Sequence, residues 1–237
     1  MESVGSHAGI GRPSSSTVAG VYDAATQQYV ELIGTRLTSA IEAQSDLDII
    51  DDFAAGVAAV EPDVVEPAAR VLDAGCGPGR VSARLAESGL RPIGIDLSSD
   101  MVRAARAAHR GLSFVCGDLG GLAFADWSFA GVVAWYSIIH TEPDSVASMV
   151  AEMARVLRPH GMLLVAFQAG DGTAVERDHA YGTGMALRTV HHDPTRIGDM
   201  MKRVGLGDVQ VSVRPPVHVH ETTAQAIVRA SAPRAWP

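Results

Sequence analysis

Residues 70–80 read Arg-Val-Leu-Asp-Ala-Gly-Cys-Gly-Pro-Gly-Arg, and this stretch decides how the rest of the chain is interpreted. An apolar segment with the length of a strand leads into a turn that contains Gly75, Gly77 and Gly79. Glycine admits positive φ angles and lets the backbone approach a ligand where a Cβ would clash. Pro78 suits the start of a following helix. The stretch therefore predicts a strand, a ligand-binding turn and a helix, with a tight turn that binds nothing as the alternative.

Composition limits the class of protein. The chain has 237 residues, 47% of them hydrophobic and 19% charged, which is enough for one globular α/β core. A net charge of -8 without any basic run argues against a dedicated nucleic-acid surface. No apolar run is long enough to span a bilayer, and no secretory signal is recognisable. We therefore expect a cytoplasmic protein, monomeric or homodimeric, that binds neither nucleic acid nor membrane.

The chain contains two cysteines, Cys76 in the glycine turn and Cys116 at the end of a later apolar run. In the sheet expected below, one strand separates the two that carry them. Two strand spacings amount to roughly 9–10 Å, which exceeds the reach of a disulfide. Reduced thiols in a cytosolic protein are the simplest interpretation. Because there is no second pair of cysteines, we expect no zinc site and no other bound metal.

Apolar periodicity predicts helices that alternate with strands along most of the chain. Helices are expected at residues 18–37, 46–60, 81–88, 100–109, 143–157 and 195–204. After the strand that begins at residue 70, further strands are expected at residues 91–97, 112–116, 130–136, 162–168, 209–213 and 224–228. Alternation of this kind implies right-handed crossovers and a mostly parallel sheet covered on both faces. The last two strands are close enough in sequence to pair antiparallel at one edge.

The chain is expected to form one domain with five parts. Residues 1–17, rich in Gly, Ser and Pro, are expected to be a disordered tail. The remaining parts are a helical lid at residues 18–66, a cofactor-binding core at 67–168, a substrate-covering insertion at 169–194, and a closing helix and hairpin at 195–237. Residues 230–237 within the last part are expected to be a second tail.

Acidic and polar residues follow several of the expected strands. Asp73, Gly75, Asp96, Asp118 and Ser137 all fall at carboxyl ends of these strands. Ligands of open α/β sheets bind at this edge, near the point where the strand order reverses. We therefore expect the five residues to converge on one ligand.

Two classes of nucleotide ligand fit a glycine turn followed by a strand-end acid. A dinucleotide fold requires G-x-G-x-x-G, with an acid about 20 residues further on that binds the ribose. Gly75 and Gly77 match this pattern, but Arg80 stands at the third position and the last glycine comes one residue early, at Gly79. Arg80 would crowd the close helix-to-strand contact that a glycine permits. A nicotinamide-dependent dehydrogenase is therefore the less favoured interpretation.

In combination, several segments resemble class I S-adenosylmethionine (SAM)-dependent methyltransferases that act on small molecules. Residues 71–79 resemble the first motif of that family, residues 95–98 its ribose-binding motif, residues 117–119 its adenine-contacting turn, residues 156–161 the turn after its fourth strand, and residues 193–206 its closing helix and hairpin. The resemblance covers about residues 22–230. It implies a Rossmann-like fold with a mostly parallel seven-stranded sheet, an antiparallel edge hairpin, helices on both faces and an N-terminal helical lid.

The resemblance also implies a cofactor and an activity. The cofactor would be S-adenosyl-L-methionine, with S-adenosyl-L-homocysteine as product, and a small-molecule acceptor would take the methyl group by in-line displacement. Asp73 and the turn amides would face the methionine part, Asp96 would accept from both ribose hydroxyls, and Asp118 would accept from the adenine amino group. The expected cofactor-binding residues are Tyr22, Tyr29, Asp73, Ala74, Gly75, Cys76, Gly77, Gly79, Arg80, Asp96, Leu97, Met101, Gly117, Asp118, Leu119, Trp135, Tyr136 and Ser137. A SAM-binding protein without transfer activity is the alternative.

A weakly acidic acceptor would need a general base, for which His140 is the first candidate. It follows the fourth expected strand of the core, and the ordinary pKa of histidine is near neutral. A histidine with a purely structural hydrogen bond is the alternative. Tyr181, His191 and His192 are the other residues expected near the substrate. Since neighbouring side chains on an extended segment point to opposite sides, at most one of the two adjacent histidines can face a pocket.

Overall fold

The structure is a computed structural model that describes residues 14–59 and 68–235. Most of the expected N-terminal tail and the expected break between the second helix and the first strand, at residues 60–67, lie outside these ranges. Helix α1 (Ser15–Ile33) begins inside the expected tail, because Ser14 caps it by accepting from the backbone N–H of Thr17. The expected C-terminal tail is also shorter than predicted, since strand β9 (Gln225–Ser231) extends to Ser231.

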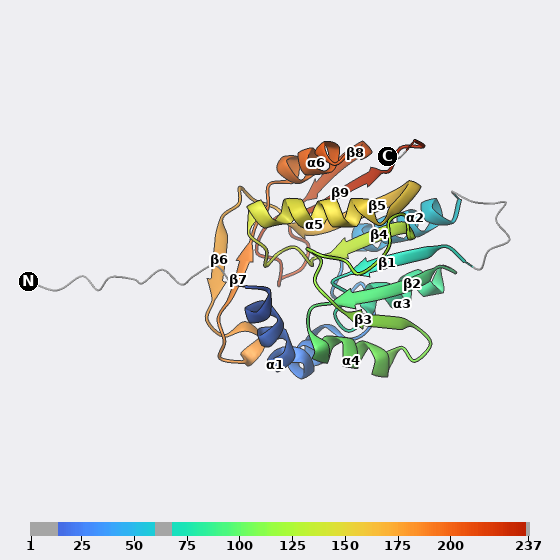
Figure 1. The fold of residues 1–237 in the computed structure, drawn as a ribbon. Coiled ribbons are helices and arrows are strands. Elements are labelled where there is room, and N and C mark those ends of the chain that lie inside the picture. Colours follow the sequence, from blue (N-terminus) through green and yellow to red (C-terminus); the bar gives the residue numbers. More distant parts are fainter. Residues whose placement is uncertain (1–13, 60–67, 236–237) are drawn as a thin grey trace, which may run out of the picture.

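A seven-stranded mixed sheet forms the centre of the molecule (Figure 1). Its other strands are β1 (Arg70–Ala74), β2 (Arg91–Asp96), β3 (Ser113–Cys116), β4 (Phe129–Trp135), β5 (Leu157–Gln168) and β8 (Gly207–Arg214). The strand order is β3-β2-β1-β4-β5-β9-β8. The five strands from β3 to β5 are parallel to one another, and β9 is antiparallel to both of its neighbours, β5 and β8. This confirms the expected parallel core with an antiparallel edge hairpin, and it confirms that one strand separates the two cysteines, which are both free.

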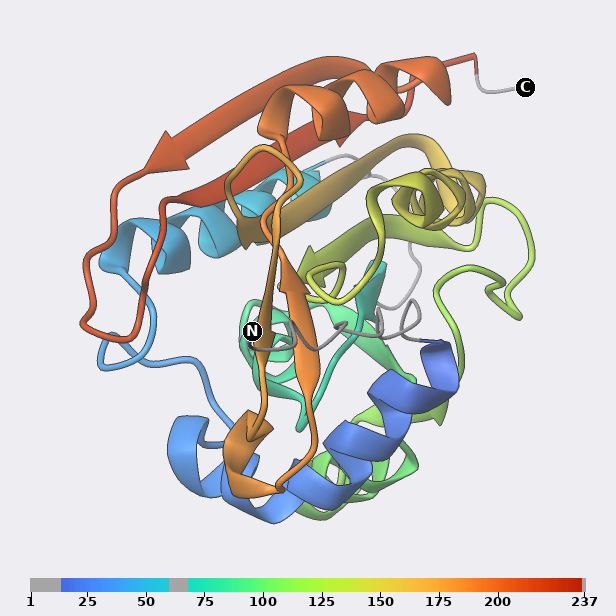
Figure 2. The same cartoon turned by 90° about the vertical axis from the view of Figure 1, so that its left-hand side faces the viewer.

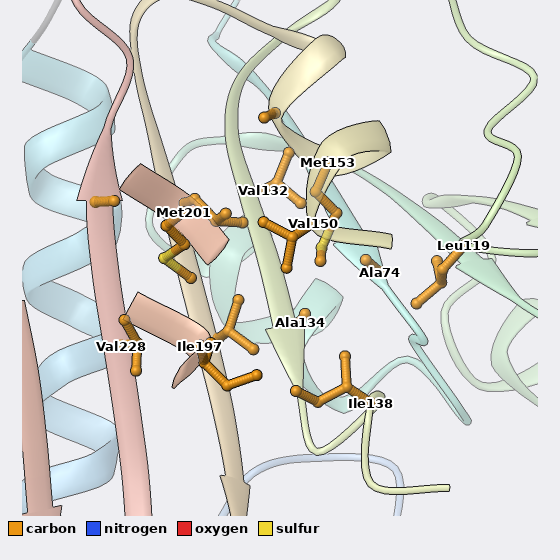
Figure 3. Packing of buried hydrophobic residues seen from close by; sticks show 14 of the residues in the cluster. Ala74, Leu119, Val132, Ala134, Ile138, Val150, Met153, Ile197, Met201 and Val228 are labelled. Carbon is orange, nitrogen blue, oxygen red and sulfur yellow. The ribbon is translucent and has the colours of Figure 1, made fainter. Parts of the chain in front are cut away.

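Helices cover both faces of the sheet. They are α2 (Gln44–Ala59), α3 (Arg80–Glu87), α4 (Ser99–Ala108), α5 (Pro143–Arg155) and α6 (Pro194–Arg203). Helices α5 and α6 pack on one face through residues such as Val150, Met153 and Ile197, which meet Val132 and Val228 of the sheet (Figure 3). The apolar side chains of α2 and α3 cover the other face, while α4 packs against β2 and β3. Burial of both sheet faces explains why the parallel strands are almost continuously apolar.

The segment expected as an insertion contains a small hairpin that the sequence did not predict. It consists of β6 (Ala174–Arg177), a 3₁₀ turn η1 (Ala180–Gly182) and β7 (Leu187–Val190), paired antiparallel. The hairpin and α1 lie beyond the ends of the parallel strands and face the viewer in Figure 2. They pack on each other through a small apolar cluster that includes Val21 and Leu187. Together they form a cover over the carboxyl edge of the sheet.

Strand β5 begins earlier than expected, at Leu157 rather than at residue 162. Its pairing with β4 jumps from Leu157 to Met162, so the expected turn at residues 158–161 is present as an irregularity within the strand. Within residues 14–59 and 68–235, none of the helices combines the length and apolar character needed to cross a membrane.

Candidate active site

The glycine turn between β1 and α3 is held in place by its own backbone. Gly75 has a φ of +78°, and a Cβ there would lie 2.2 Å from the Cβ of Ser137, so only glycine fits. Gly77 has a φ of +50°, and a Cβ there would meet nothing within 4 Å. The backbone N–H groups of Gly75 and Cys76 donate to the carbonyl of Ile95. The turn amides are therefore used within the protein, contrary to the expectation that they face a ligand.

Asp96, at the end of β2, fixes the turn from the other side. Its Oδ2 accepts from the N–H of Gly77 at 2.8 Å, and its Oδ1 accepts from the N–H of Ser98 at 2.9 Å. Partial burial raises the pKa of the carboxyl, while these two hydrogen bonds oppose that rise. Since a carboxylate has about four acceptor positions, about two remain available to a ligand.

Asp118 follows β3 and is held by a tight local turn. Its Oδ1 accepts from the N–H of Gly120 at 2.8 Å, which leaves Oδ2 available as an acceptor. Leu119 and Met101 are buried near it along the same cavity, and Leu97 adds a third apolar side chain. The residues after β2 and β3 thus provide acidic acceptors beside an apolar surface.

A cavity of about 650 Å³ brings these groups together. Among the expected site residues, its lining includes Tyr22, Tyr29, Gly75, Gly77, Asp96, Leu97, Met101, Asp118, Leu119, Trp135, Tyr136, Ser137, His140 and Tyr181. Three buried polar atoms in this lining have no hydrogen-bond partner within the described part of the chain, and while Glu142 Oε1 has an ion pair with Arg188, Trp135 Nε1 and Ser137 Oγ have no such partner. Because buried polar groups are normally paired, they are candidate ligand contacts.

Aromatic residues of the cover close one side of the cavity. The ring of Tyr22 lies 5.7 Å from that of Tyr29 and 5.8 Å from that of Tyr181, and the last two are 5.0 Å apart. Burial raises the pKa of all three hydroxyls.

Asp23 connects α1 to the segment that follows β2, because its carboxylate accepts a hydrogen bond from the hydroxyl of Ser98 at 2.6 Å.

His140 has both ring nitrogens occupied. Nδ1 lies 2.7 Å from the carbonyl oxygen of Arg188, and Nε2 lies 2.7 Å from the hydroxyl of Tyr22. A carbonyl can only accept, so we assign the proton to Nδ1, and Nε2 then accepts from Tyr22. Burial lowers the pKa of the imidazole to about 4. His140 is therefore neutral at physiological pH.

Several predicted cofactor residues are absent from the cavity lining. Asp73 is fully buried, and its Oδ2 accepts from the N–H and the hydroxyl of Ser82 at the start of α3, so it holds the turn to that helix. Burial raises the pKa of its carboxyl to about 7. Arg80 instead pairs with Glu42 at 2.7 Å. Ala74, Cys76, Gly79 and Gly117 pack against neighbouring side chains instead.

The two adjacent histidines also lie outside the cavity lining. His192 is buried, and its Nε2 is 3.0 Å from the carbonyl of Ile138. The Cβ of His191 lies against Gly170. These contacts hold both histidines away from the cavity lining.

Sequence reasoning missed the part of the lining that comes from helix ends. Ser15, Val18 and Ala19 of α1, and Ser145, Ser148 and Met149 of α5, belong to this group. The rule that ligands bind at strand ends gives no signal for helices that fold over that edge. Among the described residues, no group of three or more His, Cys, Asp or Glu side chains is placed to hold a metal ion.

Comparison with known proteins agrees with this geometry. Residues 71–161, which contain the glycine turn, Asp96 and Asp118, match the family model described as a methyltransferase domain. This matched segment, which makes up less than half of the chain, is similar to a methyltransferase domain. The chain is 41% identical over 100 residues to the demethylmenaquinone methyltransferase of Beutenbergia cavernae, an alignment that covers 42% of this chain and 41% of that protein. The chain thus spans less than half the length of that relative.

Solved structures share the fold of most of this chain at low sequence identity. Magnesium protoporphyrin IX methyltransferase from Synechocystis PCC 6803, with bound SAM, has a TM-score of 0.65 and 17% identity, covering 96% of this chain and 100% of that one. The cyclase SpnF has a TM-score of 0.69 and 18% identity, covering 94% and 97%. Since one of these neighbours is a cyclase, the fold alone does not specify methyl transfer.

Proposed function

We propose that this chain transfers a methyl group from S-adenosylmethionine to a small-molecule acceptor. The observation that carries the proposal is the convergence of Gly77, Asp96 and Asp118, from three different strand ends, on one cavity. All three residues lie within the segment that matches the methyltransferase-domain model. A cyclase or a protein that only binds SAM would share the cavity, so transfer itself requires a test.

The described residues fit the cofactor. The free acceptor positions of Asp96 suit two ribose hydroxyls, and Oδ2 of Asp118 suits an adenine amino group, with Leu97, Met101 and Leu119 as an apolar surface for the ring. The backbone N–H groups of the glycine turn already donate within the protein. The backbone carbonyl oxygens of the same turn are therefore the groups that would accept from the ammonium of the methionine part. Tyr22 and Tyr29 would cover the same end from α1.

The bound cofactor would supply an activated methyl group, and the residues of the chain would align the acceptor and exclude water. The cover formed by α1 and the β6–β7 hairpin lies over the reacting region. An acceptor that must lose a proton would need a base, and Nε2 of His140 is available only when the hydroxyl of Tyr22 leaves it or relays the proton. His140 therefore stays the candidate base, with Tyr22 positioned between it and the cavity.

The test is formation of S-adenosylhomocysteine by the purified protein in the presence of SAM and a panel of small acceptors with O, N, C or S nucleophiles. We expect acceptor-dependent product for at least one compound, and a lower turnover without a change in SAM affinity for His140→Ala. Tight SAM binding without acceptor-dependent product across the panel would favour the binding-only alternative. Binding of NAD in place of SAM would favour a dehydrogenase.

A further inference from the structure

The charges around the cavity restrict the chemical class of the methyl acceptor. When Gly77, Asp96 and Asp118 are assigned to the cofactor, the remaining lining comes mainly from the first turns of α1 and from the segment between Ile139 and α5. This remaining part is where an acceptor would bind. The inference drawn from this part of the lining rests on the proposed function, because it assumes that the cofactor occupies the part of the cavity lined by Gly77, Asp96 and Asp118.

No lysine or arginine lines the cavity among the described residues. The guanidinium of Arg188 is paired at 2.9 Å with Glu142, which itself lines the cavity. Arg177, on β6, is exposed and lies outside the lining, and its charge acts on His140 and Tyr181 from there. His140 is neutral, since burial holds the pKa of its imidazole to about 4. Among the described residues, no cationic side chain therefore lines the acceptor side, where it could pair directly with an anionic group.

The net charge of the cavity lining with bound S-adenosylmethionine also disfavours an anionic acceptor. Asp96 and Asp118 are two carboxylates in the lining, and Glu142 is neutralised by Arg188. S-adenosylmethionine carries a sulfonium, an ammonium and a carboxylate, so it adds one net positive charge. One net negative charge remains, and like charges in a partly dry site disfavour a further anion.

The acceptor side of the lining is apolar with a few hydroxyl groups. Val18 and Ala19 of α1, with Ile139 and Met149, provide the apolar side chains, and Ser145 and Ser148 of α5 provide the hydroxyls. Such a surface binds an apolar body and offers hydrogen bonds without charge.

We propose that the acceptor is an uncharged molecule with an apolar body, and that it carries no carboxylate, phosphate or sulfate group. The specificity comes from the lack of a cation in the described part of the lining as much as from favourable contacts, since an anion would lose its hydration there without gaining a direct partner. The acceptor lies between the first turns of α1 and of α5.

The test compares two phenolic probes that differ only in charge, 3,4-dihydroxybenzamide and 3,4-dihydroxybenzoate, by ligand-detected NMR titration of the full chain saturated with S-adenosylhomocysteine. We expect the amide to bind at least about tenfold more tightly, which corresponds to about 1.4 kcal/mol. Equal or tighter binding of the carboxylate would overturn the inference, as would failure of both probes to bind the loaded protein. Failure of S-adenosylhomocysteine itself to bind would instead overturn the proposed function.

Two lysine variants of α5 test whether the acceptor binds beside this helix. Ser148 and Ala147 are both exposed positions of α5, but only Ser148 lines the cavity. We expect Ser148→Lys to raise the affinity for the carboxylate probe at least about fivefold, because it supplies the missing cation. Ala147→Lys is the matched control and should leave the preference unchanged. Equal effects of the two variants would contradict the location of the acceptor beside α5.

Discussion

The carboxylate of Asp96 offers the sharpest test of how the site holds its cofactor. Each of its oxygens already accepts one backbone N–H, from Gly77 and from Ser98. Asp96→Asn keeps the shape but replaces one oxygen by an NH₂ group, which would point a donor at one of those N–H groups. The variant also loses the charge that strengthens hydrogen bonds to the ribose. Hydrogen bonds to a charged group contribute about 1.5–3 kcal/mol each, so we expect the loss of about 3 kcal/mol, or a roughly 100-fold higher Kd for SAM.

The assay is isothermal titration calorimetry with SAM and with S-adenosylhomocysteine at one fixed ionic strength. Asp100→Asn is the matched control, because Asp100 is also an acid near the start of α4 but pairs with Arg103 and lies outside the cavity lining. Thermal melts of both variants would show that they are folded. A Kd for Asp96→Asn within threefold of the wild-type value would refute the ribose role of Asp96.

Four further predictions concern buried ionisable groups. Because the pKa of His140 is lowered to about 4, we expect kcat to be flat from pH 5.5 to 7.5; a loss of activity centred near pH 6.5 would contradict this. Tyr22→Phe should lower the free energy of unfolding in urea by about 1 kcal/mol, because it leaves Nε2 of His140 without its donor; no change would show that this bond is not formed. The pKa of Asp73 is raised to about 7, above its unfolded value, so the native state binds the proton more tightly and wild-type stability falls as pH rises from about 4 to 7; Asp73→Asn should abolish that fall in urea unfolding, and an unaltered pH dependence would contradict it. Arg214→Met should lower the free energy of unfolding by about 3–5 kcal/mol, because Asp46 is 1% exposed and would lose its buried ion pair; a loss below about 1 kcal/mol would contradict this.

The fold was predictable because its core follows simple rules. The strands from β1 to β5 are apolar segments separated by helices, and their alternation requires a parallel sheet. The β6–β7 hairpin escaped prediction because its strands are four residues each and mostly exposed on β6, so they carry no apolar alternation. The same exposure explains why this segment was recognised only as an unusual insertion.

The sequence predicts which strand-end acids meet at the cavity, but it predicts less of the remaining lining. Asp96 and Asp118 follow strands directly, and strand ends meet at one edge of the sheet. The partner of His140 could not be found from sequence, because Tyr22 is 118 residues away and approaches through the fold of α1. Spacing likewise could not show that Asp73 turns toward Ser82 and Arg80 toward Glu42, since both choices depend on burial and on nearby charges.

The most direct test of the central claim is a calorimetric titration of the wild-type chain with S-adenosylmethionine, and with NAD under the same conditions. We predict that one molecule of S-adenosylmethionine binds per chain, that S-adenosylhomocysteine competes with it, and that NAD does not bind. Absence of S-adenosylmethionine binding, or binding of NAD to the same site, would contradict the assignment of the cavity beneath the cover of α1 and the β6–β7 hairpin.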